Sequence, residues 1–136
     1  MKEKIKTIQI IHLAVCAGVS LAYFFIAEPS AQSLKIPTID STSVVYLIIP
    51  VLAIVAGNFI FKSQLKQANP QLTPEENLPV YQTASIVRWA ILEGAAFVIL
   101  FVKPDFLLIG ILLIIYLASL RPTEEKITND LKNTAR

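Results

Sequence analysis

The sequence predicts an all-α fold: an integral membrane four-helix bundle made of two antiparallel helical hairpins. Of its 136 residues, 54% are hydrophobic and only 16% are charged, and the mean hydropathy is +0.61. A domain of this size has too much surface to hide that share of apolar side chains from water. Four apolar segments, separated by prolines and polar residues, carry most of the hydrophobicity. We therefore expect one membrane-embedded domain over residues 1–136.

A helix needs roughly 20 mainly apolar residues to cross a bilayer, and four segments meet or approach that length. They cover residues 8–26, 44–61, 84–102 and 106–120, of which the last is short. Lys103, Pro104 and Asp105 form a brief polar turn, which makes the last two segments an antiparallel hairpin. The remaining parts are a loop at 62–83 and a polar tail at 121–136.

The basic residues indicate how the four spans are oriented. Four spans place both termini and the 62–83 loop on one side of the membrane. That side holds Lys2, Lys4, Lys6, Lys62, Lys66, Arg121, Lys126, Lys132 and Arg136, and the other side holds Lys35 and Lys103. Because Lys and Arg gather in cytoplasmic loops, we expect both termini in the cytoplasm.

Two of the cytoplasmic stretches carry helix signals. Thr73 and Glu76 have the spacing of a capping box, with Pro74 at the first helical position. In the tail, Ile127 and Leu131 share one helical face. A tail of this kind lies along the membrane surface, docks under the bundle, or frays, and the sequence leaves these alternatives open.

Small residues four positions apart mark the expected packing faces of three spans. They are Ala14, Gly18 and Ala22 on the first span, Ala53 and Gly57 on the second, and Ala90 and Gly94 on the third. Small side chains let helix backbones approach closely, which favours helix association in lipid. We expect these faces to pack inside the bundle or between copies, and Gly110 to matter less.

Residues 10–25 also align with residues 86–101, by duplication or by the chance similarity of two apolar helices.

Five polar side chains from four spans fall at similar depths. They are His12, Asn58, Arg88, Glu93 and Tyr116. Glu93 lies near the middle of its span, and Arg88 is about 7.5 Å nearer the cytoplasm at the helical rise. The two point about 140° apart, so we expect Glu93 to contact His12, Asn58 or Tyr116. We expect Arg88 to extend to the cytoplasmic headgroups, with Trp89 at the interface beside it.

Glu93 has two interpretations. An ionisable group inside a membrane is a candidate for function, in which case Glu93 carries a proton or binds a cation or polar solute, with His12 as relay. Alternatively, a protonated Glu93 donates one hydrogen bond between helices and holds the bundle together.

The sequence lacks the motifs of enzymes, metal-binding proteins and nucleic-acid-binding proteins. The sequence has no nucleophile–base pair, metal-ligand spacing, phosphate loop or nucleotide fingerprint, and its single cysteine, Cys16, lies in an apolar run. A net charge of +2 without a basic, aromatic-rich run argues against nucleic acid. We expect no enzymatic activity, cofactor or metal. The expected partners are the lipid bilayer and either further copies of the chain or a larger membrane complex.

Two resemblances refine this expectation. The stretch from Leu92 to Phe97, LEGAAF, resembles the carboxylate helix of the proton-carrying ring subunit of rotary ATP synthases. The likeness covers one helix, the glycine-rich partner helix is absent, and the carboxylate lies on the first helix of its hairpin. The whole chain resembles small four-span bacterial membrane proteins of unassigned activity, through IVRWAILEGAAF, the KPD turn and RPTEEKI. This implies a non-enzymatic inner-membrane protein, either an accessory subunit or a self-associating bundle. The alternative is a small proton- or cation-linked transporter that uses Glu93.

Overall fold

The computed structural model describes residues 2–27, 40–41, 43–102 and 104–134, and this part of the chain is helical with no strands. The helices are α1 (Lys2–Ala27), α2 (Val44–Leu65), α3 (Leu78–Val102), α4 (Leu107–Ser119) and α5 (Glu124–Thr134), and a 3-10 turn, η1 (Pro104–Phe106), precedes α4. The all-α prediction is confirmed. The predicted hairpin turn agrees with η1 at Pro104 and Asp105, while Lys103 lies outside the described residues.

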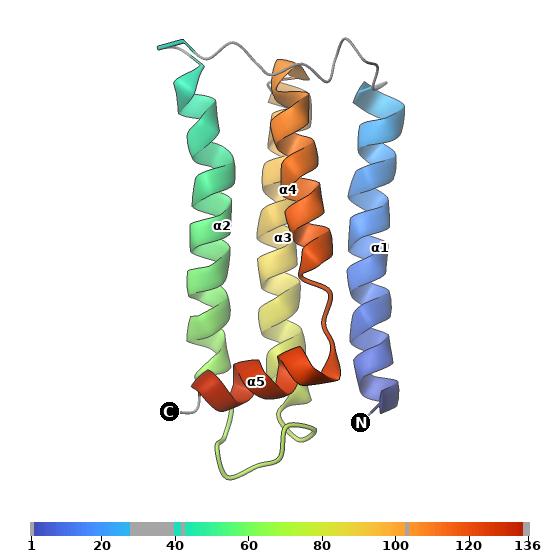
Figure 1. The fold of residues 1–136 in the computed structure, drawn as a ribbon, viewed down its shortest axis with the longest axis vertical. Coiled ribbons are helices and arrows are strands. Elements are labelled where there is room, and N and C mark those ends of the chain that lie inside the picture. Colours follow the sequence, from blue (N-terminus) through green and yellow to red (C-terminus); the bar gives the residue numbers. More distant parts are fainter. Residues whose placement is uncertain (1, 28–39, 42, 103, 135–136) are drawn as a thin grey trace.

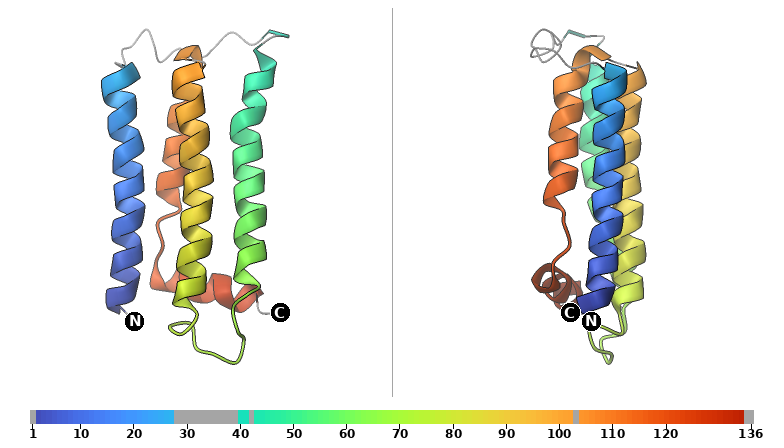
Figure 2. Two further views of the ribbon diagram at one scale, coloured as in Figure 1. Left: turned by 180° about the vertical axis from the view of Figure 1, so that it is seen from behind. Right: turned by 90° about the vertical axis from the view of Figure 1, so that its right-hand side faces the viewer.

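Helices α1 to α4 stand side by side with α3 at the centre. Helices α1 and α2 flank α3, and α4 covers one face of it (Figures 1 and 2). Helices α1 and α3 run in one direction, while α2 and α4 run in the other (Figure 1). The prediction of two hairpins is therefore wrong for the first pair, because α3 lies between α1 and α2. Helix α3 can take this central place because it buries side chains toward all three neighbours.

Helix lengths differ from the sequence prediction at several ends. Helix α1 begins at Lys2 and α3 at Leu78, so the connection between α2 and α3 is shorter than the predicted 62–83 loop. Within the described residues, α1, α2 and α3 are each long and apolar enough to cross a membrane. Helix α4 has only 13 residues, and it reaches such a length only together with α5, to which it is bent by 88°.

Side-chain hydrogen bonds order the connection before α3. The Thr73 backbone N–H donates to the Glu76 carboxylate at 2.9 Å, and the Glu76 N–H donates to the Thr73 hydroxyl at 3.2 Å. This reciprocal pair confirms the capping box, although turns follow it and the helix begins at Leu78. Asn77 also exchanges two hydrogen bonds with the backbone of Asn69. The connection is therefore fixed by its own polar groups.

The small-residue faces have different outcomes on different helices. On α2, Ala53 and Gly57 are buried, and a Cβ on Gly57 would lie 3.4 Å from Cγ of Arg88 in α3. Of the two alternatives for the face of Ala53 and Gly57, packing inside the bundle is therefore the one observed. On α3, Ala90 and Gly94 are exposed, with nothing within 4 Å of a Cβ on Gly94. Gly94 therefore does not pack inside the bundle, because the face of α3 opposite α4 is uncovered; the alternative, packing between copies, stays a prediction.

The small face of α1 is also mostly outside the core. Ala14 and Gly18 are exposed and Ala22 is half-buried, because α1 turns His12, Val19 and Tyr23 inward instead. Helix α4 supplies the glycine that the core requires: a Cβ on Gly110 would lie 2.0 Å from the Tyr23 hydroxyl oxygen. For packing within the bundle, the expectation that Gly110 matters less than the other helical glycines is therefore wrong.

Helix α5 crosses one end of the bundle, which we call the α5 end (Figure 1). Ile127 is fully buried and Leu131 nearly so, and the Tyr81 hydroxyl donates to the Asp130 carboxylate at 3.0 Å. Of the three alternatives for the tail, docking under the bundle is the one observed. The apolar face predicted from Ile127 and Leu131 is the face that docks.

Candidate functional site

The five polar residues singled out in the sequence form separate groups around α3. Arg88, Asn58 and Tyr116 lie where α3 meets α2 and α4. His12 lies where α1 meets α3 and α4. Glu93 lies apart from both groups. The sequence predicts that these five residues lie at similar depths. The structure does not bring them together into one polar cluster.

Arg88, Asn58 and Tyr116 form a chain of hydrogen bonds across three helices. The guanidinium Nη1 of Arg88 donates to Asn58 Oδ1 at 3.3 Å. The amide Nδ2 of the same asparagine donates to the Tyr116 hydroxyl oxygen at 3.2 Å. Asn58 therefore acts as acceptor and donor at once, which fixes its amide orientation and ties α2 to both neighbours.

Arg88 is held inside the bundle by aromatic and electrostatic contacts. Its guanidinium carbon lies 3.7 Å from the centre of the Phe61 ring, within the range of a cation–π contact. The Asp130 carboxylate of α5 is near enough to attract its charge. The guanidinium Nε is buried without a hydrogen-bond partner among the described residues. The prediction that Arg88 extends outward to headgroups is wrong, because Phe61 and Asn58 hold its side chain against α2.

The prediction for Trp89 is also wrong. Its side chain is 1% exposed and its ring centroid lies 4.8 Å from that of His12, so it is a core residue. The sequence around a tryptophan that follows an arginine in an apolar helix does not show whether the side chain lies in the core or at the membrane interface.

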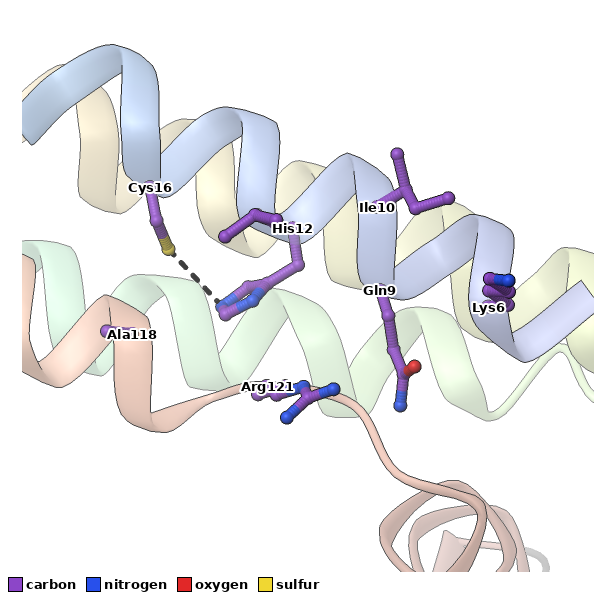
Figure 3. Close-up of a pocket in the computed structure, with 8 residues that line it drawn as sticks. Lys6, Gln9, Ile10, His12, Cys16, Ala118 and Arg121 are labelled. Atoms are coloured by element: carbon purple, nitrogen blue, oxygen red, sulfur yellow. Dashed lines mark hydrogen bonds between the residues drawn. The ribbon is translucent and has the colours of Figure 1, made fainter. Parts of the chain in front are cut away.

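His12 binds a backbone carbonyl. Its Nε2 lies 2.8 Å from the carbonyl oxygen of Leu117. When Nε2 carries the proton, the ring donates a hydrogen bond to this carbonyl at the end of α4. Cys16 Sγ is 3.6 Å from the same nitrogen (Figure 3). The contact ties α1 to α4.

The early end of α4 explains why polar side chains donate to backbone carbonyls in this region. The last carbonyls of a helix have no partner within it and must find donors elsewhere. Gln9 Nε2 donates to the Pro122 carbonyl at 2.7 Å, and Lys126 Nζ donates to the carbonyls of Ser119 and Arg121 at 3.0 and 3.3 Å. With His12 on Leu117, side chains from α1 and α5 satisfy the chain where α4 stops. Sequence reasoning missed Gln9 and Lys126 because a backbone acceptor leaves no pattern in the sequence.

Glu93 is half-buried on the side of α3 that faces α1, near enough to Cys16 to influence it electrostatically. Within the described residues it has no hydrogen bond to His12, Asn58, Tyr116 or any other group. The predicted contacts of Glu93 are therefore not formed. The described residues also contain no group of three or more His, Cys, Asp or Glu side chains placed to hold a metal ion.

Comparison of the chain with protein-family models, with curated proteins and with solved structures finds no match. The two resemblances noted from the sequence therefore remain predictions, and function has to be argued from the geometry.

Proposed function

We propose that this chain is a non-enzymatic, multi-pass protein of the bacterial inner membrane that acts by associating with other membrane helices. Its termini and the connection between α2 and α3 lie in the cytoplasm, in agreement with the basic residues at the α5 end. The partner is either a second copy or a larger membrane complex. The observation that carries the proposal is the uncovered face of α3, where Ala90 and Gly94 are exposed and a Cβ on Gly94 meets open space.

The outer surface supports the membrane location. Large apolar side chains are exposed along the long helices, among them Leu13 at 67%, Phe25 at 69% and Phe59 at 73%. Such surfaces on a monomer indicate contact with lipid or with another protein. Helix α5 and the α2–α3 connection, which are polar, lie at the same end of the molecule (Figure 1). This arrangement supports an orientation in which that end faces the aqueous side of the membrane.

The small residues on α3 support association rather than lipid contact alone. In lipid, helices attract each other mainly by close packing, and small side chains permit it. Helix α3 already uses this principle against Gly57 of α2, where a Cβ would be 3.4 Å from Arg88. The face of α3 opposite α4 presents the small residues Ala90 and Gly94, with nothing in the described chain within 4 Å of a Cβ on Gly94.

The test is the oligomeric state of the full chain in lipid vesicles, measured by energy transfer between labelled copies. Gly94→Leu should abolish the transfer signal, because the added side chain separates the helices. Ala56→Leu is the matched control, since Ala56 is also small and exposed but lies on α2. Equal transfer in wild type and Gly94→Leu would contradict the proposal for this face. Recovery of the wild type in the soluble fraction would contradict the membrane location itself.

One observation favours a second candidate, a proton- or cation-linked transporter. A glutamate that served only to link helices would donate to a neighbouring helix, and Glu93 has no such bond in the described chain. Vesicles loaded with a pH-sensitive dye would report a flux that Glu93→Gln abolishes without changing the melting temperature. A wild type that produces no flux under a proton or cation gradient rules this candidate out.

A further inference from the structure

We propose that the groove between α1 and the end of α4 binds one anionic phospholipid of the cytoplasmic leaflet. Its phosphate lies between Lys6 and Arg121, and its acyl chain lies along Ile10, Leu13 and Ala118. The proposal rests on the membrane location proposed above and is independent of self-association.

The groove exists because α4 stops early. Helix α4 ends at Ser119, and the chain runs without helix to α5, which begins at Glu124. Helix α1 continues past this point, so a cavity of about 490 Å³ is left between α1 and the end of α4. This volume is within the range of small-molecule sites. Figure 3 shows Gln9 and His12 on α1 facing this chain segment, with Arg121 opposite them.

The charge of the groove fits an anion. Its lining includes the cations Lys6 and Arg121 and no acidic residue. Neither cation has an ion-pair partner in the part of the chain that the structure describes. The other polar lining groups are already used, since Gln9 donates to the Pro122 carbonyl and His12 bonds the Leu117 carbonyl. Lys126, bound to the Ser119 and Arg121 carbonyls, adds a third positive charge nearby.

The apolar wall favours a phospholipid over a free anion. Ile10 and Leu13 line the groove and are 57% and 67% exposed, so the groove continues into the apolar outer surface of α1. Lys6 and Leu13 are about 10 Å apart along the helix at 1.5 Å per residue. A headgroup at Lys6 therefore places its acyl chain beside Leu13. Basic pockets between helices on the cytoplasmic side are known to bind anionic headgroups.

The experiment counts lipids bound to the purified full chain by native mass spectrometry, with phosphatidylglycerol and phosphatidylcholine in turn. Wild type should retain one phosphatidylglycerol and prefer it to phosphatidylcholine. The double variant Lys6→Ala, Arg121→Ala should bind roughly 30-fold more weakly, the combined effect of two cations on an anionic lipid. The matched control is Lys62→Ala, Lys66→Ala, which removes the same charge from exposed positions at the end of α2. The control should bind like wild type.

A further variant tests the apolar part of the site. Ala118→Trp fills the groove while Lys6 and Arg121 remain, so binding should also weaken. Soluble glycerol phosphate, added in excess, should not displace the lipid. Equal weakening in the two charge variants would show general surface attraction and overturn the proposal. Displacement by glycerol phosphate, wild-type affinity in Ala118→Trp, or no preference for phosphatidylglycerol would also overturn it. Fractionation of the same cells tests the membrane location separately, since a chain found in the membrane without lipid preference refutes only the lipid site.

Discussion

Gly110 is the helical glycine whose replacement should cost most. A Cβ at this position would fall 2.0 Å from the Tyr23 hydroxyl oxygen and 2.8 Å from two ring carbons. Tyr23 is 3% exposed and its hydroxyl donates to the Ala96 carbonyl of α3, so the ring cannot move without loss. One contact therefore joins α1, α3 and α4.

The size of the effect of Gly110→Ala follows from three contributions. Overpacking of a core costs about 1–3 kcal/mol. Loss of the Tyr23 hydrogen bond adds about 0.6–1 kcal/mol in a membrane protein. Alanine stabilises a helix by about 0.5–1 kcal/mol relative to glycine, because glycine loses more conformational freedom on folding, and this gain offsets part of the loss. We therefore expect a net loss of about 1–3 kcal/mol in the free energy of unfolding.

The matched control is the same change at Gly94, where nothing lies within 4 Å of the new Cβ. In the monomer, Gly94→Ala should be neutral or stabilising by about 0.5–1 kcal/mol, because only the helix preference changes there. Reversible unfolding in mixed micelles, with increasing SDS, measures both variants. Adding Tyr23→Phe to Gly110→Ala should recover part of the loss, since the closest atom is removed. A Gly110→Ala variant as stable as Gly94→Ala would refute this account of the core.

Three further predictions follow from other parts of the molecule. Reporter fusions after residue 136 and within residues 30–40 should give opposite signals, and alkaline phosphatase activity from the C-terminal fusion would contradict the cytoplasmic assignment. Glu93→Gln and Glu93→Leu should both leave the unfolding free energy of the monomer within about 0.5 kcal/mol, because Glu93 has no hydrogen-bond partner in the described chain; a loss in the leucine variant alone, measured in the same micelles, would reveal a partner. Tyr81→Phe removes the hydrogen bond to Asp130, so trypsin should cut the tail roughly 5-fold faster, as expected for about 1 kcal/mol of local stability. Thr83→Val is its control, since the Thr83 hydroxyl bonds only its own helix at Pro79, and an equal rate in the two variants would contradict the role of Tyr81 in docking α5.

Sequence reasoning located the helices well because their signals are local. Apolar length, proline positions and the Thr73–Glu76 spacing each act within a few residues, and the structure contains the predicted helices and the capping hydrogen bonds, although several helix ends are shifted. The depth of Asn58, Arg88 and Tyr116 was also readable, because each helical residue advances a fixed distance along the axis. Their hydrogen-bonded chain is the part of the predicted polar layer that the structure contains.

The order of the helices around the bundle was not readable from sequence. Apolar helices are similar on many faces, so nothing local indicates that α3 lies between α1 and α2. This arrangement decides that Trp89 meets His12 and that Glu93 faces α1, away from Asn58 and Tyr116. The partner of His12 was hidden for a second reason, since a carbonyl at Leu117 is available only because α4 ends early.

The two ends of this chain depend on each other during synthesis. His12 and Gln9 leave the ribosome early, but their acceptors, the carbonyls of Leu117 and Pro122, lie 105 and 113 residues later in the sequence. At the usual 5–20 residues per second, α1 waits roughly 5–20 s for the segment that completes it. Throughout that interval its donors have no native acceptor. A ribosome that stalls within α4 would therefore leave a product that is defective at both ends.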